Sequence, residues 1–263
     1  MPKSYSSDLT RAQFELLEPL LPAAKPGGRP RSVCLWCILN GILYVVVDGC
    51  KWRDLPGDLP PWQTVYTYFR NWRKDGTWEV IHTRLRGWTR AVSGRPESPS
   101  EVIIDSQSVP TATMVHKAVG YDGGKNIKGR KRHAIVDTLG LLMYVMVTAA
   151  STPERAGIKQ AFEKLMALKP QVSRLYLVWA DGGYSGQPFL QWAMDTFRLI
   201  VEVVLRPEQT KGFVLLKKRW VVERTFGWWN WYRRLSKDYE RLPETAETVI
   251  YIAMIRLMLR RLA

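Results

Sequence analysis

The sequence predicts an α/β protein in which an all-helical N-terminal domain of helix-turn-helix type precedes a domain built on a mixed β-sheet. Apolar residues recur at helical spacing as far as residue 93. Residues 94–100 (Gly-Arg-Pro-Glu-Ser-Pro-Ser) combine turn-forming residues and are typical of a linker. Beyond them, short β-branched runs alternate with helical segments. We therefore predict two domains, over residues 1–93 and 101–263.

The first domain is expected to contain four helices. Asp8 is a good N-cap for the first, and Asp48-Gly49 ends the second. Prolines and glycines separate the periodic segments. The predicted helices cover residues 8–21, 32–47, 62–73 and 77–92.

The third of these helices has the pattern of a DNA-recognition helix. Trp62, Val65, Phe69 and Trp72 form an apolar stripe, so the polar and basic side chains point elsewhere. The alternative is a small helical bundle with a solvated basic face. The formal net charge of +15 favours DNA. The expected DNA contacts on this helix are Gln63, Arg70, Arg73 and Lys74.

A basic segment, Pro26-Gly-Gly-Arg-Pro-Arg31, lies between the first two helices. Arginines in such segments enter the minor groove of A·T-rich DNA. Arg29 and Arg31 are therefore further candidates for DNA contacts, with a plain basic linker as the alternative.

The excess of positive charge predicts a polyanionic partner, either nucleic acid or an anionic membrane surface. No apolar run has the length of a membrane-spanning helix, and the first residues lack an apolar signal core. The three cysteines, Cys34, Cys37 and Cys50, are expected to be reduced core residues. These features favour a cytosolic protein that binds nucleic acid rather than membrane.

The second domain is expected to begin with three β elements and then to alternate helix and strand. The predicted strands cover residues 101–105, 133–137, 141–147, 174–181 and 199–205. The predicted helices cover residues 153–168, 187–197, 217–234 and 244–262. This order matches a ribonuclease-H-like mixed sheet, in which the first three strands are antiparallel and later ones parallel.

Two predicted strands of this domain end in an aspartate. Asp105 closes the first strand, and Asp181, followed by two glycines, closes the fourth. An aspartate at such a place is by default a turn-former, or else a site residue at the edge of a sheet. In the predicted fold the two strand ends lie side by side, so the carboxylates would be neighbours.

The predicted helix over residues 217–234 carries one carboxylate, Glu223. At helical spacing it shares a largely apolar face with Arg219 and Phe226, so it would point inwards. A buried carboxylate is costly unless it is paired or binds a metal. An ion pair with Arg219 is the simple alternative. If Glu223 joins Asp105 and Asp181, the three oxygen ligands suit two Mg²⁺ ions and phosphoryl chemistry.

Residues 120–133 are glycine-rich and basic, and we expect them to form a loop. The spacing of a phosphate-binding P-loop is missing. The cations instead suggest contacts to the phosphate backbone, with a solvated charge run as the alternative. The residues concerned are Lys125, Lys128, Arg130, Lys131 and Arg132.

Motifs along nearly the whole chain carry a family resemblance. In the first half they are Leu16-Leu-Glu-Pro-Leu-Leu-Pro22, Gly28-Arg-Pro-Arg31, Gly49-Cys-Lys-Trp-Arg53 and Pro61-Trp-Gln-Thr-Val-Tyr66. In the second half they are Ile104-Asp-Ser-Gln-Ser108, Lys128-Gly-Arg-Lys-Arg-His133, Asp137-Thr-Leu-Gly-Leu141, Ala180-Asp-Gly-Gly-Tyr184 and Arg219-Trp-Val-Val-Glu-Arg-Thr-Phe-Gly-Trp228. The sequence resembles the DDE transposases of small bacterial insertion sequences, in particular the insertion-sequence-five group.

The resemblance assigns Asp105, Asp181 and Glu223 to the catalytic, metal-binding triad. Arg219 matches the arginine of a wider Tyr-x2-Arg-x3-Glu-x6-Lys signature. Leu216 stands in place of its tyrosine and Asn230 in place of its lysine. The residues expected to face DNA on this segment are Arg219, Asn230, Arg233 and Arg234.

The resemblance also implies an activity. Such an enzyme binds the inverted-repeat ends of its element and uses two Mg²⁺ ions, replaceable by Mn²⁺, to cut a strand. It then joins the freed 3′-OH to target DNA, acting as a homo-oligomer on double-stranded DNA. The alternatives are a catalytically silent repressor derived from a transposase and a general nuclease of the same fold. The C-terminal helix would form an oligomer interface or pack within its own domain.

Overall fold

The computed structural model describes residues 4–24, 27, 31–205 and 218–263. Arg29 and Leu216 lie outside these residues, so the expectations for them stay predictions.

The second half of the chain forms a six-stranded mixed sheet with the order β2-β3-β1-β5-β6, and β4 pairs with β3. Its strands are β1 (Glu101–Pro110), β2 (Gly120–Asp122), β3 (Ile127–Asp137), β4 (Leu142–Ala149), β5 (Leu177–Asp181) and β6 (Ile200–Val204). β1 is antiparallel to β3 and parallel to β5, and β5 is parallel to β6. The predicted mixed, ribonuclease-H-like sheet is confirmed, with β1 and β5 side by side as expected.

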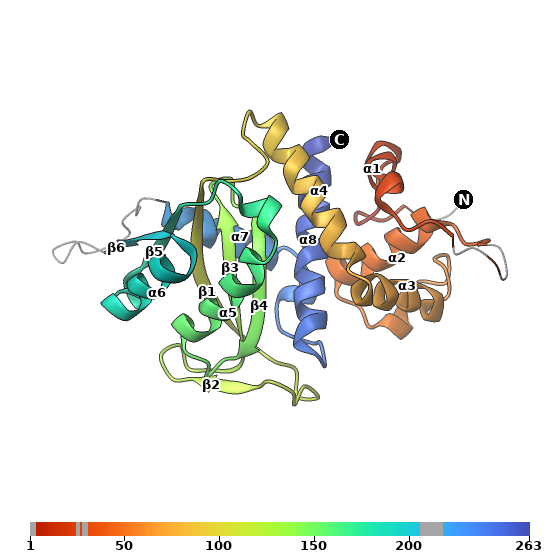
Figure 1. Cartoon of the computed structure of the whole chain (residues 1–263). Coiled ribbons are helices and arrows are strands. Elements are labelled where there is room, and N and C mark those ends of the chain that lie inside the picture. Colours follow the sequence, from red (N-terminus) through yellow and green to blue (C-terminus); the bar gives the residue numbers. More distant parts are fainter. Residues whose placement is uncertain (1–3, 25–26, 28–30, 206–217) are drawn as a thin grey trace.

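Helices precede the sheet, cover both of its faces and end the chain (Figure 1). They are α1 (Arg11–Leu17), α2 (Leu35–Asp48), α3 (Trp62–Lys74), α4 (Thr77–Val92), α5 (Glu154–Met166), α6 (Gln187–Phe197), α7 (Arg219–Asn230) and α8 (Pro243–Leu262). The all-helical N-terminal region is therefore confirmed. α1 begins later than predicted, because Thr10 rather than Asp8 is its N-cap and forms a capping box with Gln13.

The sheet separates two hydrophobic cores. Ile104 and Val178 face α5 and α6 on one side. On the other side Ile103 belongs to a larger core that includes α7, α8 and the N-terminal helices. Alternate residues of β1 thus enter different cores, as the pleat of a strand requires.

The C-terminal helix α8 lies at the centre of the molecule, between the sheet and the N-terminal helices (Figure 1). The Tyr251 ring of α8 meets the His82 ring of α4 edge to face at 4.9 Å. Ile252, Ile255 and Leu259 are buried. α8 is therefore a core element, and these three apolar side chains do not form an exposed oligomer interface.

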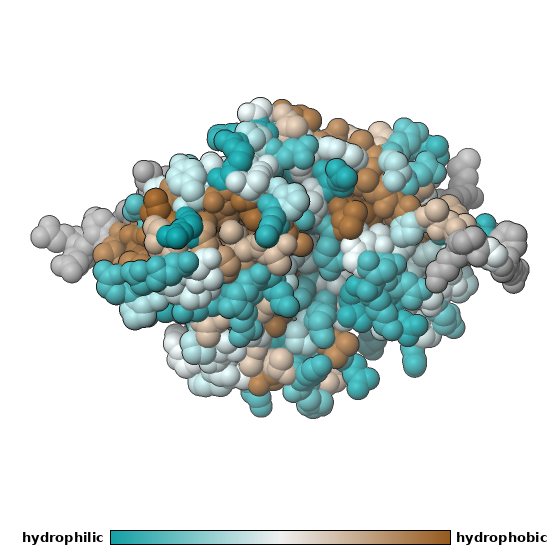
Figure 2. Space-filling model, in the orientation of Figure 1, coloured by the Kyte–Doolittle hydropathy of each residue, from teal (hydrophilic) through white to brown (hydrophobic). Residues whose placement is uncertain are grey.

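The surface of the helical region is partly hydrophilic. Figure 2 shows hydrophilic residues gathered over the lower part of this region, where α3 lies. None of the helices in the described part of the chain combines the length and apolar character needed to cross a bilayer.

Several boundaries differ from the prediction. β1 continues to Pro110, so Asp105 lies within the strand rather than at its end. β3 begins at Ile127, so residues that we expected in a basic loop form a strand. The cysteines are free, but Cys34 is exposed and the other two are only partly buried, so the expectation of core cysteines is wrong.

Candidate active site

The site begins where β1 and β5 run in parallel. Their registered pairs run from Glu101–Leu177 to Ile103–Trp179. The same register, continued by two residues, puts Asp105 level with Asp181. Residues at equivalent positions on neighbouring parallel strands point to the same face of a sheet. The two aspartates therefore lie side by side, although β1 continues beyond Asp105.

Asp105 lies in an environment that disfavours its negative charge. The pKa of Asp105 is raised to about 7, chiefly by burial and also by the charge of Asp181, against the lowering effect of a hydrogen bond from Ser106 N–H. That N–H donates to Oδ1 at 2.7 Å. Binding of a cation would stabilise the ionised form of the Asp105 carboxyl group.

Arg219, at the start of α7, joins the second aspartate to the glutamate. Its Nη2 lies 3.5 Å from Asp181 Oδ2 and 3.6 Å from Glu223 Oε1. The ion pair between Arg219 and Glu223, the simple alternative for this glutamate, is thus present. It does not separate Glu223 from the site, because the same guanidinium contacts Asp181.

Glu223 does not point into the core, contrary to the inward orientation that we expected. The buried side of α7 is formed by Val221, Val222, Thr225, Phe226 and Trp229. The Glu223 side chain is 51% exposed. The core side of the helix is therefore rotated relative to the predicted one, and the carboxylate faces solvent where a substrate can approach.

Glu154 is a fourth carboxylate of the site, which sequence reasoning missed. Its Oε1 accepts a hydrogen bond from Ser106 Oγ at 2.7 Å and lies 3.3 Å from Lys125 Nζ. A Cβ added to Gly183 would lie 3.0 Å from Glu154 Oε2 and equally close to Asp181 Oδ1. Glu154 therefore adjoins Asp181 across a glycine backbone. Burial opposes its charge, but Ser106 and Lys125 outweigh burial and lower the pKa of Glu154.

Sequence alone gives only a weak signal for Glu154. It opens α5 with no periodic or strand-end pattern to mark it. An acidic residue in the first turn of a helix is ordinary, because it complements the helix dipole. Glu154 is placed in the site by its hydrogen bond with Ser106 and its ion pair with Lys125, which only the folded chain shows.

The Tyr184 side chain lies beside the carboxylates of the site and is fully buried. Burial raises its pKa well above the usual value, and the charges of Asp105, Glu154 and Asp181 raise it further, whereas the Ser106 side chain acts in the opposite direction. The Tyr184 hydroxyl therefore stays protonated.

The donor chemistry of the site fits a divalent cation. Carboxylate oxygens are the ligands that Mg²⁺ prefers, and the raised pKa of Asp105 shows negative charge in need of compensation. In the described residues no three His, Cys, Asp or Glu side chains are close enough together to hold a metal ion. Arg219 instead occupies the place between Asp181 and Glu223.

Several predicted DNA contacts are accessible in the structure, and their roles stay predictions. Gln63, Arg70 and Lys74 of α3 are exposed and Arg73 is partly exposed. Elsewhere, the exposed candidates are Lys125, Lys128, Asn230 and Arg233.

Three other predicted phosphate contacts are wrong, because their side chains are buried. Arg130 is fully buried and pairs with Asp238 at 3.1 Å, and it also donates to backbone carbonyls. Arg132 is 1% exposed and donates to Leu235 O. Lys131 pairs with Asp122 at 3.3 Å. β3 carries these cations into the fold, where they hold other segments in place.

Two more candidates have partners within the chain. Arg31 is exposed, and its guanidinium donates hydrogen bonds to the carbonyl oxygens of Pro22 and Ala23. Arg234 pairs with Glu240 at 2.8 Å and donates to Cys50 O. Both side chains retain accessible surface, so a DNA contact is compatible with these bonds.

Comparison with known proteins identifies the family of the chain. Residues 9–82 match the family described as "Putative transposase of IS4/5 family", and residues 96–258 match "Transposase DDE domain". The chain is 34% identical over 102 residues to the "Insertion element IS402 uncharacterized 16.2 kDa protein" of Burkholderia cepacia, covering 36% of this chain and 68% of that protein.

It is also 30% identical over 120 residues to the "Putative transposase for insertion sequence element IS402" of the same organism. That match covers 43% of this chain and 54% of the relative, so the chain spans only about half the length of this relative. The DDE-domain match alone extends over more than half of the chain. With the mixed sheet and its carboxylates in place, the chain belongs to the DDE transposases of the IS4/5 family.

Proposed function

We propose that this protein is a DNA transposase that binds the terminal inverted repeats of an insertion sequence, cuts a strand at each end and joins the freed 3′-OH to target DNA. The observation that carries the proposal is the contact of one arginine with two carboxylates, beside a third. Arg219 contacts Asp181 and Glu223, and Asp105 lies level with Asp181. Side chains of a sheet and a separate helix meet at one place, where a backbone phosphate can approach.

In this proposal Asp105, Asp181 and Glu223 supply the oxygen ligands for two Mg²⁺ ions, for which Mn²⁺ can substitute. When bound, such ions would supply the activation of water or a 3′-OH as the nucleophile and the stabilisation of the leaving oxygen. Arg219, which contacts Asp181 and Glu223, would be within reach of a phosphate that approaches them. Lys125, next to Glu154, lies where it can neutralise a phosphate oxygen of the strand being cut.

Glu154 has a supporting part in the proposal. It accepts a hydrogen bond from Ser106, whose backbone N–H binds Asp105, and it lies beside the Lys125 ammonium. Partners of this kind orient the residues that act directly. Glu154 therefore fixes the positions of Lys125 and of the β1 carboxylate.

DNA recognition is assigned to the N-terminal helices. The exposed face of α3 carries Gln63 and Lys74, which suit a helix in a major groove. Two element ends must be held together for transposition. We therefore propose that the protein acts as a homo-oligomer, at least a dimer, on double-stranded DNA.

The decisive experiment is strand cleavage by Asp181→Ala on DNA carrying the ends of the element. We expect no Mg²⁺- or Mn²⁺-dependent cleavage, with binding of the ends largely retained, because the carboxylate is a ligand and not a DNA contact. Asp195→Ala, which removes an exposed carboxylate of α6, is the control and should cleave normally.

The outcomes separate the alternatives. Nicking that persists in Asp181→Ala contradicts the assignment of the site. End binding without cleavage in the unaltered protein supports the silent repressor, and equal cutting of end-bearing and random DNA supports a general nuclease.

A further inference from the structure

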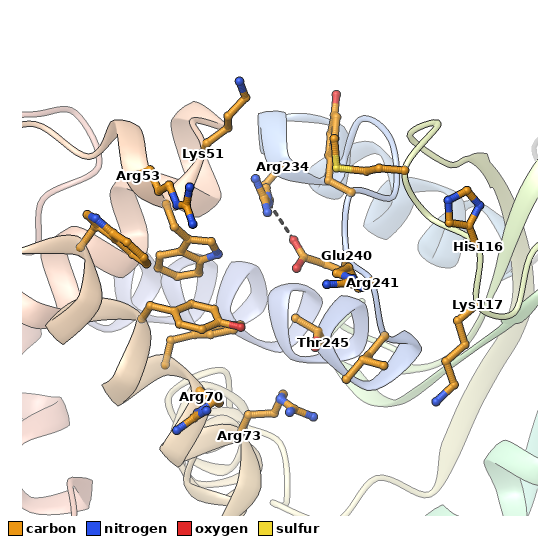
Figure 3. A pocket seen from close by; sticks show the side chains of 17 residues that line it. Lys51, Arg53, Arg70, Arg73, His116, Lys117, Arg234, Glu240, Arg241 and Thr245 are labelled. Carbon is orange, nitrogen blue, oxygen red and sulfur yellow. Dashed lines mark hydrogen bonds and ion pairs between the residues drawn. The ribbon is translucent and has the colours of Figure 1, made fainter.

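A large cavity of about 870 Å³ lies between the N-terminal helices and the catalytic half of the protein, away from the carboxylates. One wall comes from α3 and the preceding segment, with Trp62, Tyr66 and Arg70. The opposite wall comes from the connection between β1 and β2 and from the segment before α8, with Lys117 and Tyr239. Figure 3 shows Arg53, Arg70 and Arg73 on one side of the cavity and His116 and Lys117 on the other.

The charged side chains that line the cavity are almost all positive. Cations come from both walls, and among the described residues the only acidic side chain in the lining is Glu240, which pairs with Arg234 at 2.8 Å. None of the described residues forms a salt bridge with Arg70, Arg73 or Lys117, although the charge of Glu79 acts on Arg73. The excess of positive charge suits a polyanion.

Aromatic rings lie among these cations. Tyr66 is 37% exposed and Tyr239 is 36% exposed. The Arg53 guanidinium lies 5.5 Å from the Trp62 ring. Cationic grooves with accessible aromatic rings are characteristic of sites for unpaired nucleic acid, because the rings stack on bases while the cations track the phosphates. Within a duplex the bases are already stacked on one another, and their faces are not available to protein rings.

The cavity lies at the far end of two of the elements that carry catalytic candidates, β1 and α7. β1 runs from Asp105 to Pro110, roughly 17 Å at the rise of a strand, and α7 runs over roughly 18 Å from Arg219 to Asn230. The two converge beyond these ends, since Asp238 N–H donates to Pro110 O at 2.9 Å. A DNA strand that leaves the active site along them passes the exposed Asn230, Trp231 and Arg233 before it reaches the cavity.

We propose that this cavity binds unpaired nucleotides of a DNA strand whose reacting phosphate, a few nucleotides further along, lies at the carboxylates, with bases against Tyr66 and Tyr239 and phosphates at Arg70, Arg73 and Lys117. The inference rests on the proposed function and deepens it. The substrate for this cavity is a single strand, opened from the duplex, rather than the duplex that α3 recognises. The cavity holds the opened strand in place while a phosphate a few nucleotides away reacts.

The test compares the binding of the full-length protein to two probes of one sequence. One is a single strand of about ten nucleotides containing fluorescent 2-aminopurine, and the other is the blunt duplex. We expect Tyr66→Leu to weaken single-strand binding roughly tenfold and to abolish fluorescence quenching, because the stacking surface is lost. Tyr66→Phe, which keeps the ring, should behave like the unaltered protein.

A second pair of variants tests the charge. Lys117→Ala should weaken single-strand binding and reduce the slope of log K against log salt concentration by about one, as for a single phosphate contact. Lys164→Ala removes an exposed lysine of α5 far from the cavity and should change neither quantity.

The proposal is overturned if Tyr66→Leu, folded as judged by circular dichroism, quenches and binds like Lys164→Ala. Equal weakening of the duplex and the single strand would also overturn it, because the cavity would then hold a duplex. The outcome for the proposed function is separate. If the unaltered protein cleaves no end-bearing DNA but its single-strand binding still depends on Tyr66, the cavity stands and the transposase activity fails.

Discussion

Among single residues, Glu154 shows how the candidate site extends beyond the side chains that a motif marks. The sequence pointed to Asp105, Asp181 and Glu223, because two follow apolar strand runs and the third stands alone in a basic helix. Glu154 has no such mark. Its contact with Ser106, at 2.7 Å, and with Lys125, at 3.3 Å, exists only in the folded chain.

Glu154→Gln should therefore impair catalysis without impairing DNA binding. The amide keeps the size of the side chain but no longer attracts the Lys125 ammonium. We expect kcat for strand cleavage to fall roughly tenfold, as is typical when a residue that orients a reactive group is changed. The dissociation constant for end DNA should change less than twofold. Steady-state cleavage assays and fluorescence anisotropy measure the two quantities.

Glu163→Gln is the matched control, because it makes the same change at an exposed position of the same helix. It should leave both quantities unaltered. Equal kcat values for Glu154→Gln and Glu163→Gln would show that Glu154 has no part in the reaction.

Among the elements, β3 differs most from its expected role. A basic segment that reads as a DNA-binding loop is a buried strand paired on both sides, with β1 and β4. Arg130 crosses the fold to Asp238 and to the carbonyl of Glu240, and Arg132 reaches Leu235. These bonds attach the segment between α7 and α8 to the sheet, so β3 positions the helix that carries Glu223.

Arg130→Ala should destabilise the protein rather than simply weaken DNA binding. Removing one partner of a buried ion pair leaves Asp238 charged and unpaired, which costs about 3–5 kcal/mol. Urea denaturation should show this loss in the free energy of unfolding. Lys128→Ala, at an exposed position of the same strand, should change it by about 0.5 kcal/mol or less. If both variants changed the free energy of unfolding by similarly small amounts, Arg130 would be a surface cation after all.

Glu247 of α8 makes the stability of the protein depend on pH. Its carboxylate accepts a hydrogen bond from Val147 N–H of β4 at 2.8 Å, and burial raises its pKa to about 7. Because folding raises this pKa, the contribution of Glu247 to the stability of the protein is complete at a pH below the pKa that Glu247 has in the unfolded chain. That contribution is lost as the pH rises through about 7.

Glu247→Gln should remove this dependence, because the amide oxygen keeps the hydrogen bond without the charge. We expect the free energy of unfolding to rise by about 1–3 kcal/mol at a pH above 8 and to change little near pH 5. Denaturant titrations at the two pH values provide the measurement. A uniform change at both pH values would show that the charge of Glu247 is not the cause.

On the scale of the whole molecule, one hydrophobic core unites the N-terminal helices with the catalytic half. α8 follows the catalytic residues in the sequence, yet its side chains pack with α4 and with the sheet. The division at residues 94–100 stays a prediction, but the two sides of it share buried residues in one continuous core. The cavity proposed for unpaired DNA lies between the same two parts.

A shared core predicts that both parts unfold together. Leu259→Ala removes a fully buried side chain of α8 and should lower stability by about 2–5 kcal/mol. Far-ultraviolet circular dichroism and tryptophan fluorescence should follow one coincident thermal transition, shifted to lower temperature in the variant. Two separate transitions, only one of them shifted, would mean that the parts are independently stable.

The sequence by itself determined the order and type of most elements, the mixed sheet and the residues proposed as the catalytic triad. These features depend on local patterns: β-branched runs, helical periodicity and glycine or proline breaks, all of which act over a few residues. The recognisable motifs around Asp105, Asp181 and Glu223 are equally local.

Only the tertiary structure decided which charges are free and which side of a helix is buried. Arg130 and Lys128 look alike in sequence and, two residues apart in β3, point to the same face of the sheet. The segment before α8 covers Arg130, whereas Lys128 is exposed. α7 buries a side that is rotated from the predicted one and shares only Phe226 with it, because the positions of the sheet and of α8 set the rotation of the helix. Glu154, Tyr184 and the cavity lining come together from distant segments, and long-range packing leaves no local pattern in the sequence.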